Sequence, residues 1–192
     1  MMTRLRTVLI ATTFIVLLVG SFAAQTLGHP ERFTAVAVAV GNEYGTGAGT
    51  VEITIDRWST QAEREQLVGA LLQKGPDELL DQMQHIRPVG RIRTPDSIGY
   101  DLRFAQQTPL PDGGRSIVIA TDRPIGFWEA TVRPRTFDYP FTVIQMRIPA
   151  EGAGSGTMSY ATRVVAHDNV IELEDYASKP IMLNEIRSED KE

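Results

Sequence analysis

Serine and histidine are the side chains of this sequence that could supply nucleophilic chemistry. Ser155 lies among glycines, and the histidines beyond the first 23 residues are His29, His85 and His167. An activated serine needs an imidazole within hydrogen-bond reach, and no GxSxG elbow is present. No HxH or HExxH spacing occurs, and His167-Asp168 fits a tight turn for backbone reasons. The sequence therefore identifies no catalytic residue, and it predicts no metal site and no cofactor.

Two carboxylates lie close together near the C-terminus. Glu172 and Glu174 alternate with Ile171 and Leu173, so the two acids share the polar face of a predicted strand. Glycoside hydrolysis needs two carboxyl groups set across a cleft rather than side by side. We therefore interpret this pair as facing solvent.

The segment 122–141 (DRPIGFWEATVRPRTFDYPF) combines aromatic rings with guanidinium groups. It is long and irregular, and such loops often carry function. Aromatic faces and arginines together can hold an amphipathic or anionic ligand. We therefore predict ligand-binding residues at Arg123, Phe127, Trp128, Arg133, Arg135 and Tyr139. In the alternative interpretation, the rings plug one end of a barrel, and the arginines pair with Asp122, Glu129 and Asp138.

A second group of arginines lies on two neighbouring strand-like segments. Arg91 and Arg93 share one strand face, and Arg103 follows on the next strand. If this face points inward, a barrel would have a charged lumen. Because a buried guanidinium needs a partner, we favour the outward orientation, opposite acidic side chains.

The elements that must position these residues are mostly strands. Period-two alternation is clear in 50–58, where Val51, Ile53 and Ile55 face one way. The segments PDGG at 111–114 and HDN at 167–169 are typical of hairpin turns. The predicted strands cover 33–40, 50–58, 89–94, 98–105, 115–122, 141–148, 157–166, 170–176 and 181–186.

A pair of helices is predicted over about 60–86. Thr60 and Glu63 match a capping box, and Leu67 and Leu71 begin an apolar stripe at helical spacing. The pair Gly75-Pro76 fits the end of one helix and the first turn of the next.

The predicted fold class is α+β, mostly β, with a single β-rich domain at 33–187. About nine strands in an antiparallel meander would leave long open edges, which closure removes. We expect a barrel or strongly curved sheet, with one αα-hairpin after the second strand; a flat sandwich is the alternative. Two glycine runs of the form GxGxGT, at 45–50 and 152–157, are interpreted as hairpin turns because each leads into a strand.

Residues 1–23 have the pattern of an export signal. Arg4 and Arg6 precede an apolar run at 8–19, and small residues follow, so we place the cut after Ala23. The run is shorter than the roughly 20 residues of a membrane span, although an uncleaved anchor is the alternative. A flexible lead-in at 24–32 and a disordered acidic tail at 188–192 would flank the domain.

Composition narrows the class of protein. The formal net charge of −5 becomes −7 once Arg4 and Arg6 are removed, and an acidic chain argues against nucleic-acid binding. The absence of cysteine excludes disulfides and thiol chemistry. The outline resembles lipocalin-like binding proteins in architecture alone, because Asp56-Arg57 precedes Trp58 where their Gly-x-Trp signature would require glycine.

We favour an exported, periplasmic or extracellular protein that binds a small apolar or amphipathic ligand without catalysis. No membrane span is expected after signal cleavage. One alternative is an exported hydrolase or isomerase that uses Asp, Glu or Tyr with Arg. The other is a structural or partner-binding protein of the cell envelope.

Overall fold

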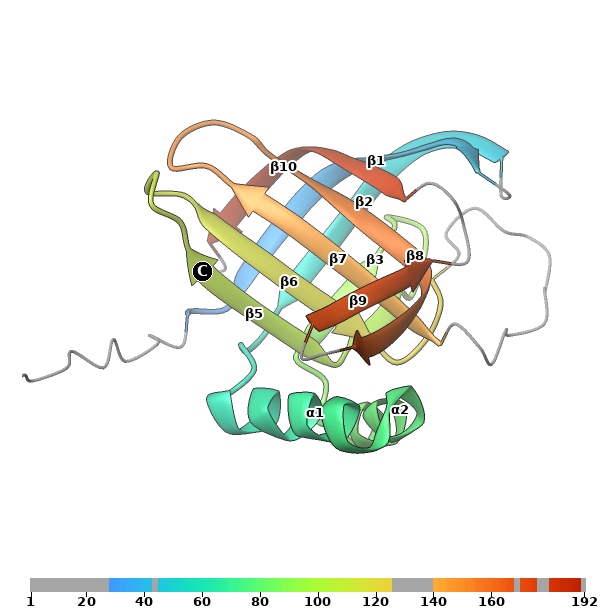
Figure 1. Cartoon of the computed structure of the whole chain (residues 1–192). Coiled ribbons are helices and arrows are strands. Elements are labelled where there is room, and N and C mark those ends of the chain that lie inside the picture. The colour runs from blue at the N-terminus through green and yellow to red at the C-terminus, as the bar shows by residue number, and fades with distance from the viewer. Residues whose placement is uncertain (1–27, 43–44, 126–139, 168–169, 176–179, 191–192) are drawn as a thin grey trace, which may run out of the picture.

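The protein is an antiparallel β-barrel with two helices on its outside (Figure 1). The computed structural model describes residues 28–42, 45–125, 140–167, 170–175 and 180–190. One sheet contains all ten strands, in the order β4-β3-β2-β1-β10-β8-β7-β6-β5, and β9 pairs with β8 off this path. The predicted fold class is thus confirmed, including the αα-hairpin after the second strand. The elements are β1 (Glu31–Asn42), β2 (Gly45–Ile55), α1 (Gln61–Lys74), α2 (Pro76–His85), β3 (Gly90–Arg93), β4 (Tyr100–Leu102), β5 (Phe104–Pro109), β6 (Arg115–Thr121), β7 (Phe141–Ile148), β8 (Gly154–His167), β9 (Val170–Asp175) and β10 (Ile181–Asp190).

Alternating side chains fill the barrel interior. In β1, Phe33, Ala35 and Ala37 are buried while the residues between them are more exposed, and β2 continues the same pattern through Ile53 and Ile55. The small alanines of β1 leave room for larger side chains from other strands, an arrangement common in small barrels. A single apolar cluster draws on β1 to β8 and β10, so side chains rather than a hollow occupy the centre.

One continuous stretch of chain, 100–109, closes the barrel. The sequence predicts one strand over 98–105, but the stretch forms β4 paired with β3 and then β5, which continues to Pro109 and pairs with β6. The change falls at Arg103, whose backbone N–H donates to Ala120 O at 2.9 Å. Ala105 then exchanges hydrogen bonds with Ser59, which follows β2. The split arises because a strand that joins the two sides of a curled sheet must change neighbours along its length.

The sheet extends beyond the expected ends of the domain. Glu31 and Arg32 already belong to β1, where they pair with Asp190 and Glu189 of β10. Strand pairing between the two ends of the chain therefore includes residues 188–190, which composition alone had assigned to a tail. Strand β1 pairs with this acidic segment along one edge, whereas the pairing of β10 with β8 ends at Ile186.

Most of the two glycine runs lies in strands, and Gly152 alone of their glycines is in a turn. Gly45 to Gly49 are part of β2, and Gly154 and Gly156 are part of β8. A Cβ added at Gly156 would come within 2.4 Å of Gln145 O on β7. Glycine is therefore needed at this position for close approach of the neighbouring strand, which is a regular role of glycine in sheets.

The helical pair forms as its sequence signals predict. Both hydrogen bonds of the capping box between Thr60 and Glu63 are present. Gly75 has φ of 88°, which glycine adopts readily, and Pro76 starts α2. None of the described helices is long and apolar enough to cross a membrane.

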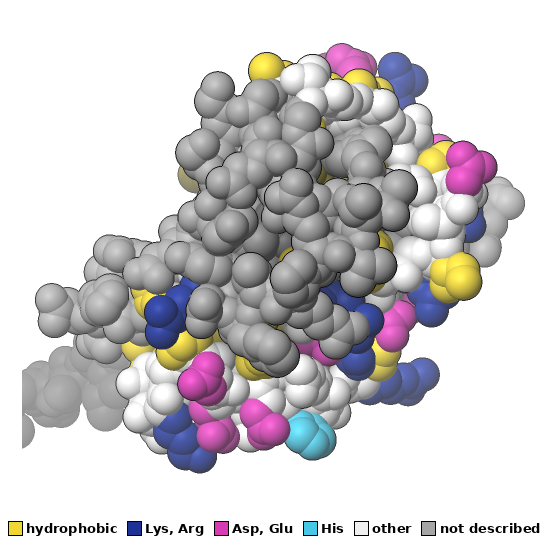
Figure 2. Space-filling model, turned by 90° about the vertical axis from the view of Figure 1, so that its right-hand side faces the viewer, with side chains coloured by type: hydrophobic (Ala, Val, Ile, Leu, Met, Phe, Trp, Pro, Cys, Tyr) yellow, Lys and Arg dark blue, Asp and Glu magenta, His cyan; other side chains and the backbone are white. Residues whose placement is uncertain are grey.

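A second apolar core lies between the helices and the outer face of the barrel. Leu67, Leu71, Leu79 and Met83 of the helices pack here with Phe141 of β7. Phe104, Ala120 and Val164 are the partly buried barrel residues against them. Charged side chains are scattered among other polar groups on the outer surface of the helices (Figure 2). The αα-hairpin thus shields a strip of barrel wall that would otherwise be exposed and apolar.

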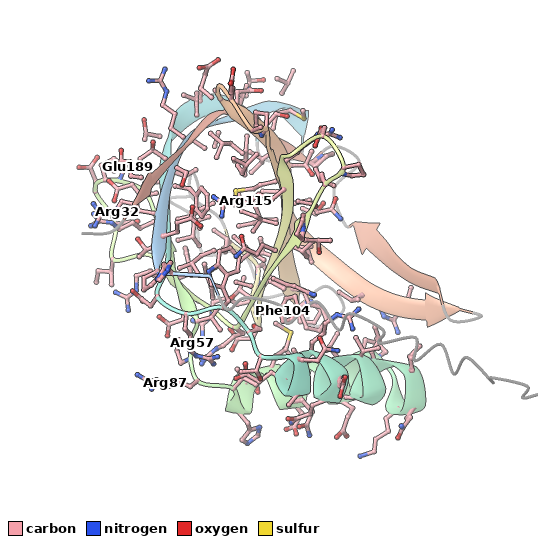
Figure 3. The ribbon with its side chains drawn as sticks, turned by 90° about the vertical axis from the view of Figure 1, so that its left-hand side faces the viewer. Arg32, Arg57, Arg87, Phe104, Arg115 and Glu189 are labelled. Carbon is pink, nitrogen blue, oxygen red and sulfur yellow. The ribbon has the colours of Figure 1, made fainter. Side chains whose placement is uncertain are left out.

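Arg57 holds the two ends of the helical pair together. Its guanidinium forms two hydrogen bonds of 2.9 Å with the Glu63 carboxylate at the start of α1. It also donates to Arg87 O, just after α2, at 2.8 Å (Figure 3). The hydrogen bonds from Arg57, followed by those from Thr60, hold the pKa of Glu63 below its ordinary value of 4.5.

Replacing Glu63 by glutamine is therefore expected to cost about 0.5–1 kcal/mol at neutral pH, because the cap can persist while the charge is lost. The lowered pKa of Glu63 stabilises the fold above pH 4.5, and this contribution disappears as pH falls through the folded-state value. Urea unfolding of wild type and E63Q should thus converge in acid. E65Q, on the same helix, is the matched control; equal stability loss by E63Q at every pH would contradict the role of the charge.

Candidate functional site

A pocket opens at one end of the barrel, which we call the mouth. Its volume is about 1310 Å³. Three segments contribute to it: β5 with the turn into β6, β7 with the turn into β8, and the final part of β10. The lining residues are Gln107, Pro109, Gly113, Gly114, Arg115, Ile148, Pro149, Ala150, Gly152, Ala153, Glu185, Ile186, Arg187 and Ser188.

The two walls of this pocket differ in chemistry. Ile148, Pro149 and Ala150 give the β7–β8 side an apolar surface. Arg115 and Gln107, on the β5–β6 side, present polar groups. Small residues dominate the turns, and nothing lies within 4 Å of a Cβ built on Gly152. A concave site with an apolar wall and a few polar groups is the general form of a small-molecule site.

An internal ion pair lies at the floor of the mouth. The Arg115 guanidinium donates to both oxygens of Glu31, to Oε2 at 2.8 Å and also to Oε1. It donates as well to Gln107 Oε1 at 2.9 Å, and the Ser188 hydroxyl donates to Glu31 Oε1 at 2.6 Å. Glu31 is buried, whereas the Arg115 side chain keeps 27% of its exposure. Glu31 thus neutralises Arg115, which faces the interior between the two sides of the barrel (Figure 3).

Arg115 also contacts the apolar core directly below the mouth. Its guanidinium carbon lies 5.7 Å from the centre of the Phe33 ring. This distance is within the range of a cation–π interaction. The mouth therefore marks the boundary between a dry core and a polar layer.

A β-bulge in β10 brings charged side chains to the rim. The pairing of β10 with β1 shifts between Thr34 and Val36, and its pairing with β8 shifts between Leu183 and Ile186. Glu185 lies in this bulge with φ of 51°. Its carboxylate is 3.8 Å from the Arg187 guanidinium, and both side chains are largely exposed.

Asp112 stabilises the turn on the opposite rim. Its Oδ1 accepts a hydrogen bond from Gly114 N at 3.1 Å, and its carboxylate pairs with Arg147. The backbone hydrogen bond from Gly114, followed by the one from Arg147, lowers the pKa of Asp112. This carboxylate therefore remains charged and fixes the β5–β6 turn against β7.

Of the six ligand-binding residues predicted from the sequence, the structure describes Arg123, which is at the other end of the barrel from the mouth. Arg123 follows the far end of β6, and its Nε lies 3.6 Å from Asp122 Oδ1. The other five, Phe127, Trp128, Arg133, Arg135 and Tyr139, lie outside the described residues. The prediction for this loop therefore stays a prediction.

Asp122 is the buried centre of a polar group at that far end. Its Oδ1 is 3.5 Å from Arg103 Nε and accepts a hydrogen bond from the Thr121 hydroxyl at 3.3 Å. Arg103 also donates to Ile86 O after α2, so it ties the barrel to the helices. These contacts are structural: Asp122 balances the charge of Arg103 and Ile86 O accepts one of its hydrogen bonds, whereas the buried Nε of Arg103 has no hydrogen-bond partner.

The outward orientation expected for the other arginines is confirmed. Arg91 pairs with Asp101 at 3.2 Å, and Arg93 donates to Glu52 at 2.6 Å. Both arginine side chains are exposed. The barrel lumen is therefore not lined by this cluster.

Sequence reasoning missed the pair Glu31–Arg115. Glu31 was assigned to a flexible lead-in, and Arg115 was treated only as the first residue of a strand. One signal was available, because Glu31 shares the inward face of β1 with Phe33 and Ala35, two and four residues further along. Its partner on β6 could not be identified, because that pairing spans 84 positions.

Histidine and the isolated serine do not form a catalytic group among the described side chains. His85 accepts or donates a 2.7 Å hydrogen bond with Asp81 O on the outer surface of α2. His29 lies at the mouth end, where its carbonyl accepts a bond from the Trp58 indole. In the described part of the chain, no group of acidic, histidine or cysteine side chains has the arrangement of a metal site.

Comparison of the chain with family models, curated proteins and solved structures gave no match.

Proposed function

We propose that this protein is an exported, non-enzymatic binding module that takes a small amphipathic ligand at the mouth of its barrel. The observation that carries the proposal is a pocket of about 1310 Å³ with one apolar and one polar wall. The arrangement of charge, apolar run and small residues at 1–23 supports export.

The packing of the molecule favours the mouth over the barrel centre. Buried isoleucine, valine and leucine side chains fill the interior, so a ligand there would have to displace the core. The mouth needs no such rearrangement. A ligand with an apolar body could lie against Ile148 and Pro149 while its polar group faces the polar side chains that line the rest of the pocket.

The pKa shifts resolved in the structure are of the kind that surface ion pairs produce. Those of Glu63, Glu78 and Asp112 are all lowered, in each case by hydrogen bonds and a nearby cation. A general acid working near neutral pH would instead need a raised pKa. None of these three carboxylates is therefore a candidate general acid.

Filling the pocket is expected to abolish ligand uptake. Ala153 is exposed in the β7–β8 turn and lines the mouth, so A153W should place an indole in the space without disturbing the core. We expect binding of the amphipathic dye 8-anilinonaphthalene-1-sulfonate, followed by its fluorescence, to weaken at least ~10-fold. A62W, on the exposed surface of α1, is the matched control.

The same measurement distinguishes two possible positions of the ligand, the mouth and the predicted 122–141 loop. If A153W binds the dye as wild type does and W128A does not, the ligand lies at the 122–141 loop. If neither substitution changes uptake, both locations are excluded. Native mass spectrometry of protein from its own compartment would then show whether any small molecule is carried.

A further inference from the structure

Glu185 occupies a backbone conformation that its residue type disfavours. Among the residues that the structure describes, it is the one non-glycine with positive φ, at 51°. The left-handed region costs an ordinary L-residue roughly 1–2 kcal/mol, and glycine avoids this cost. The bulge in β10 requires such a conformation, but a bulge of this kind normally has glycine there.

The contacts of Glu185 do not offset this strain. Its side chain is 66% exposed, and its ion pair with Arg187 spans 3.8 Å between two exposed side chains. Exposed pairs of this type contribute little to stability. Strained residues that persist without structural benefit are concentrated at functional sites.

Two of the charged side chains that line the pocket remain available to pair with a ligand. Glu31 neutralises Arg115 through both carboxylate oxygens, so that pair presents little net charge. Glu185 and Arg187 remain at the rim, with opposite charges on the same strand, and both line the pocket. A ligand head group that carries both charges would complement this rim.

We propose that Glu185 is a specificity-determining residue, which selects amphipathic ligands with a zwitterionic head group. The Glu185 carboxylate pairs with the cationic nitrogen of the ligand, and Arg187 pairs with its anionic group. The apolar tail lies against the β7–β8 wall. This inference rests on the proposed function, because it concerns the ligand of the same pocket.

Four single-chain amphiphiles of similar chain length that differ in the head group test the proposal. They are N-octyl-N,N-dimethylglycine, octanoate, octylammonium and 1-octanol, each titrated into the full mature protein by calorimetry. The wild type should bind the dimethylglycine compound most tightly. In E185Q its affinity should fall ~5-fold or more, and that of octanoate should not fall. E189Q, on the outer face of the same strand (Figure 3), should bind like wild type.

The variant E185G adds a readout that separates function from folding. Glycine should relieve the strained φ, so its melting temperature should rise by ~2 °C, even though binding weakens as in E185Q. A lower melting temperature in E185G, or unchanged head-group preference in E185Q, would overturn the role of Glu185 while leaving the pocket in place. Failure of the wild type to bind any of the four compounds would overturn the proposed function and this inference together.

Discussion

Replacing Phe141 by alanine is expected to lower the free energy of unfolding by about 3–5 kcal/mol. Phe141 begins β7 and is completely buried, yet it belongs to the core outside the barrel rather than to the one within. Its ring packs among Leu67, Leu71 and Met83 of the helices. Removal of the ring would leave a cavity between two elements that pack chiefly through side chains.

Urea unfolding monitored by circular dichroism measures this loss, and hydrogen exchange locates it. The amides of α1 and α2 should lose protection before those of β1 and β2, because the barrel retains its own core. L72A is the control, since Leu72 lies on the exposed side of α1 and should cost less than about 1 kcal/mol. If F141A loses less than about 1 kcal/mol of unfolding free energy, the packing of the helices against the barrel contributes little to the stability of the fold.

Removing the charge of Glu31 is expected to be almost as damaging. E31Q would leave Arg115 inside the mouth without its carboxylate, and breaking a buried pair costs about 3–5 kcal/mol. Because Arg115 keeps 27% of its side-chain exposure, water can partly replace the lost partner. We therefore expect a loss of about 2–4 kcal/mol, measured by urea unfolding.

The double substitution E31L/R115M tests the cause of that loss. Replacing both charges by apolar groups of similar size should restore most of the stability, because no uncompensated charge remains. E52Q removes one partner of the more exposed Arg93–Glu52 pair and should cost about 1 kcal/mol or less. If E31L/R115M is no more stable than E31Q, the effect belongs to packing rather than to charge.

The sequence was sufficient for those features that depend on local patterns. Alternation located most strands, although 98–105 divides into β4 and β5 and β2 starts at Gly45, and Thr60, Glu63, Gly75 and Pro76 located the helices. The curvature of the sheet could also be predicted, because a sheet of many hairpin-linked strands would otherwise have long open edges. These signals act between residues that are near neighbours in the chain.

The features that escaped prediction depend on distant parts of the chain. The division at Arg103 is set by which strands lie on either side, and the glycines of β8 are set by the close approach of β7. The mouth pocket combines three segments that meet only after the barrel closes. The strained φ of Glu185 likewise follows from a register shift against two neighbours. No local pattern in a single sequence contains such information.

The pairing of the first residue of β1 with the last residue of β10 bears on how the protein can be handled. Both ends of the barrel chain leave beside the opening, so an affinity tag, fusion partner or surface linker at either end would crowd the ligand's route. The turn at 94–99 between β3 and β4 lies at the opposite end, and Ile98 there is 85% exposed. An immobilised biosensor should therefore be attached through that turn, which leaves the opening free toward the solution.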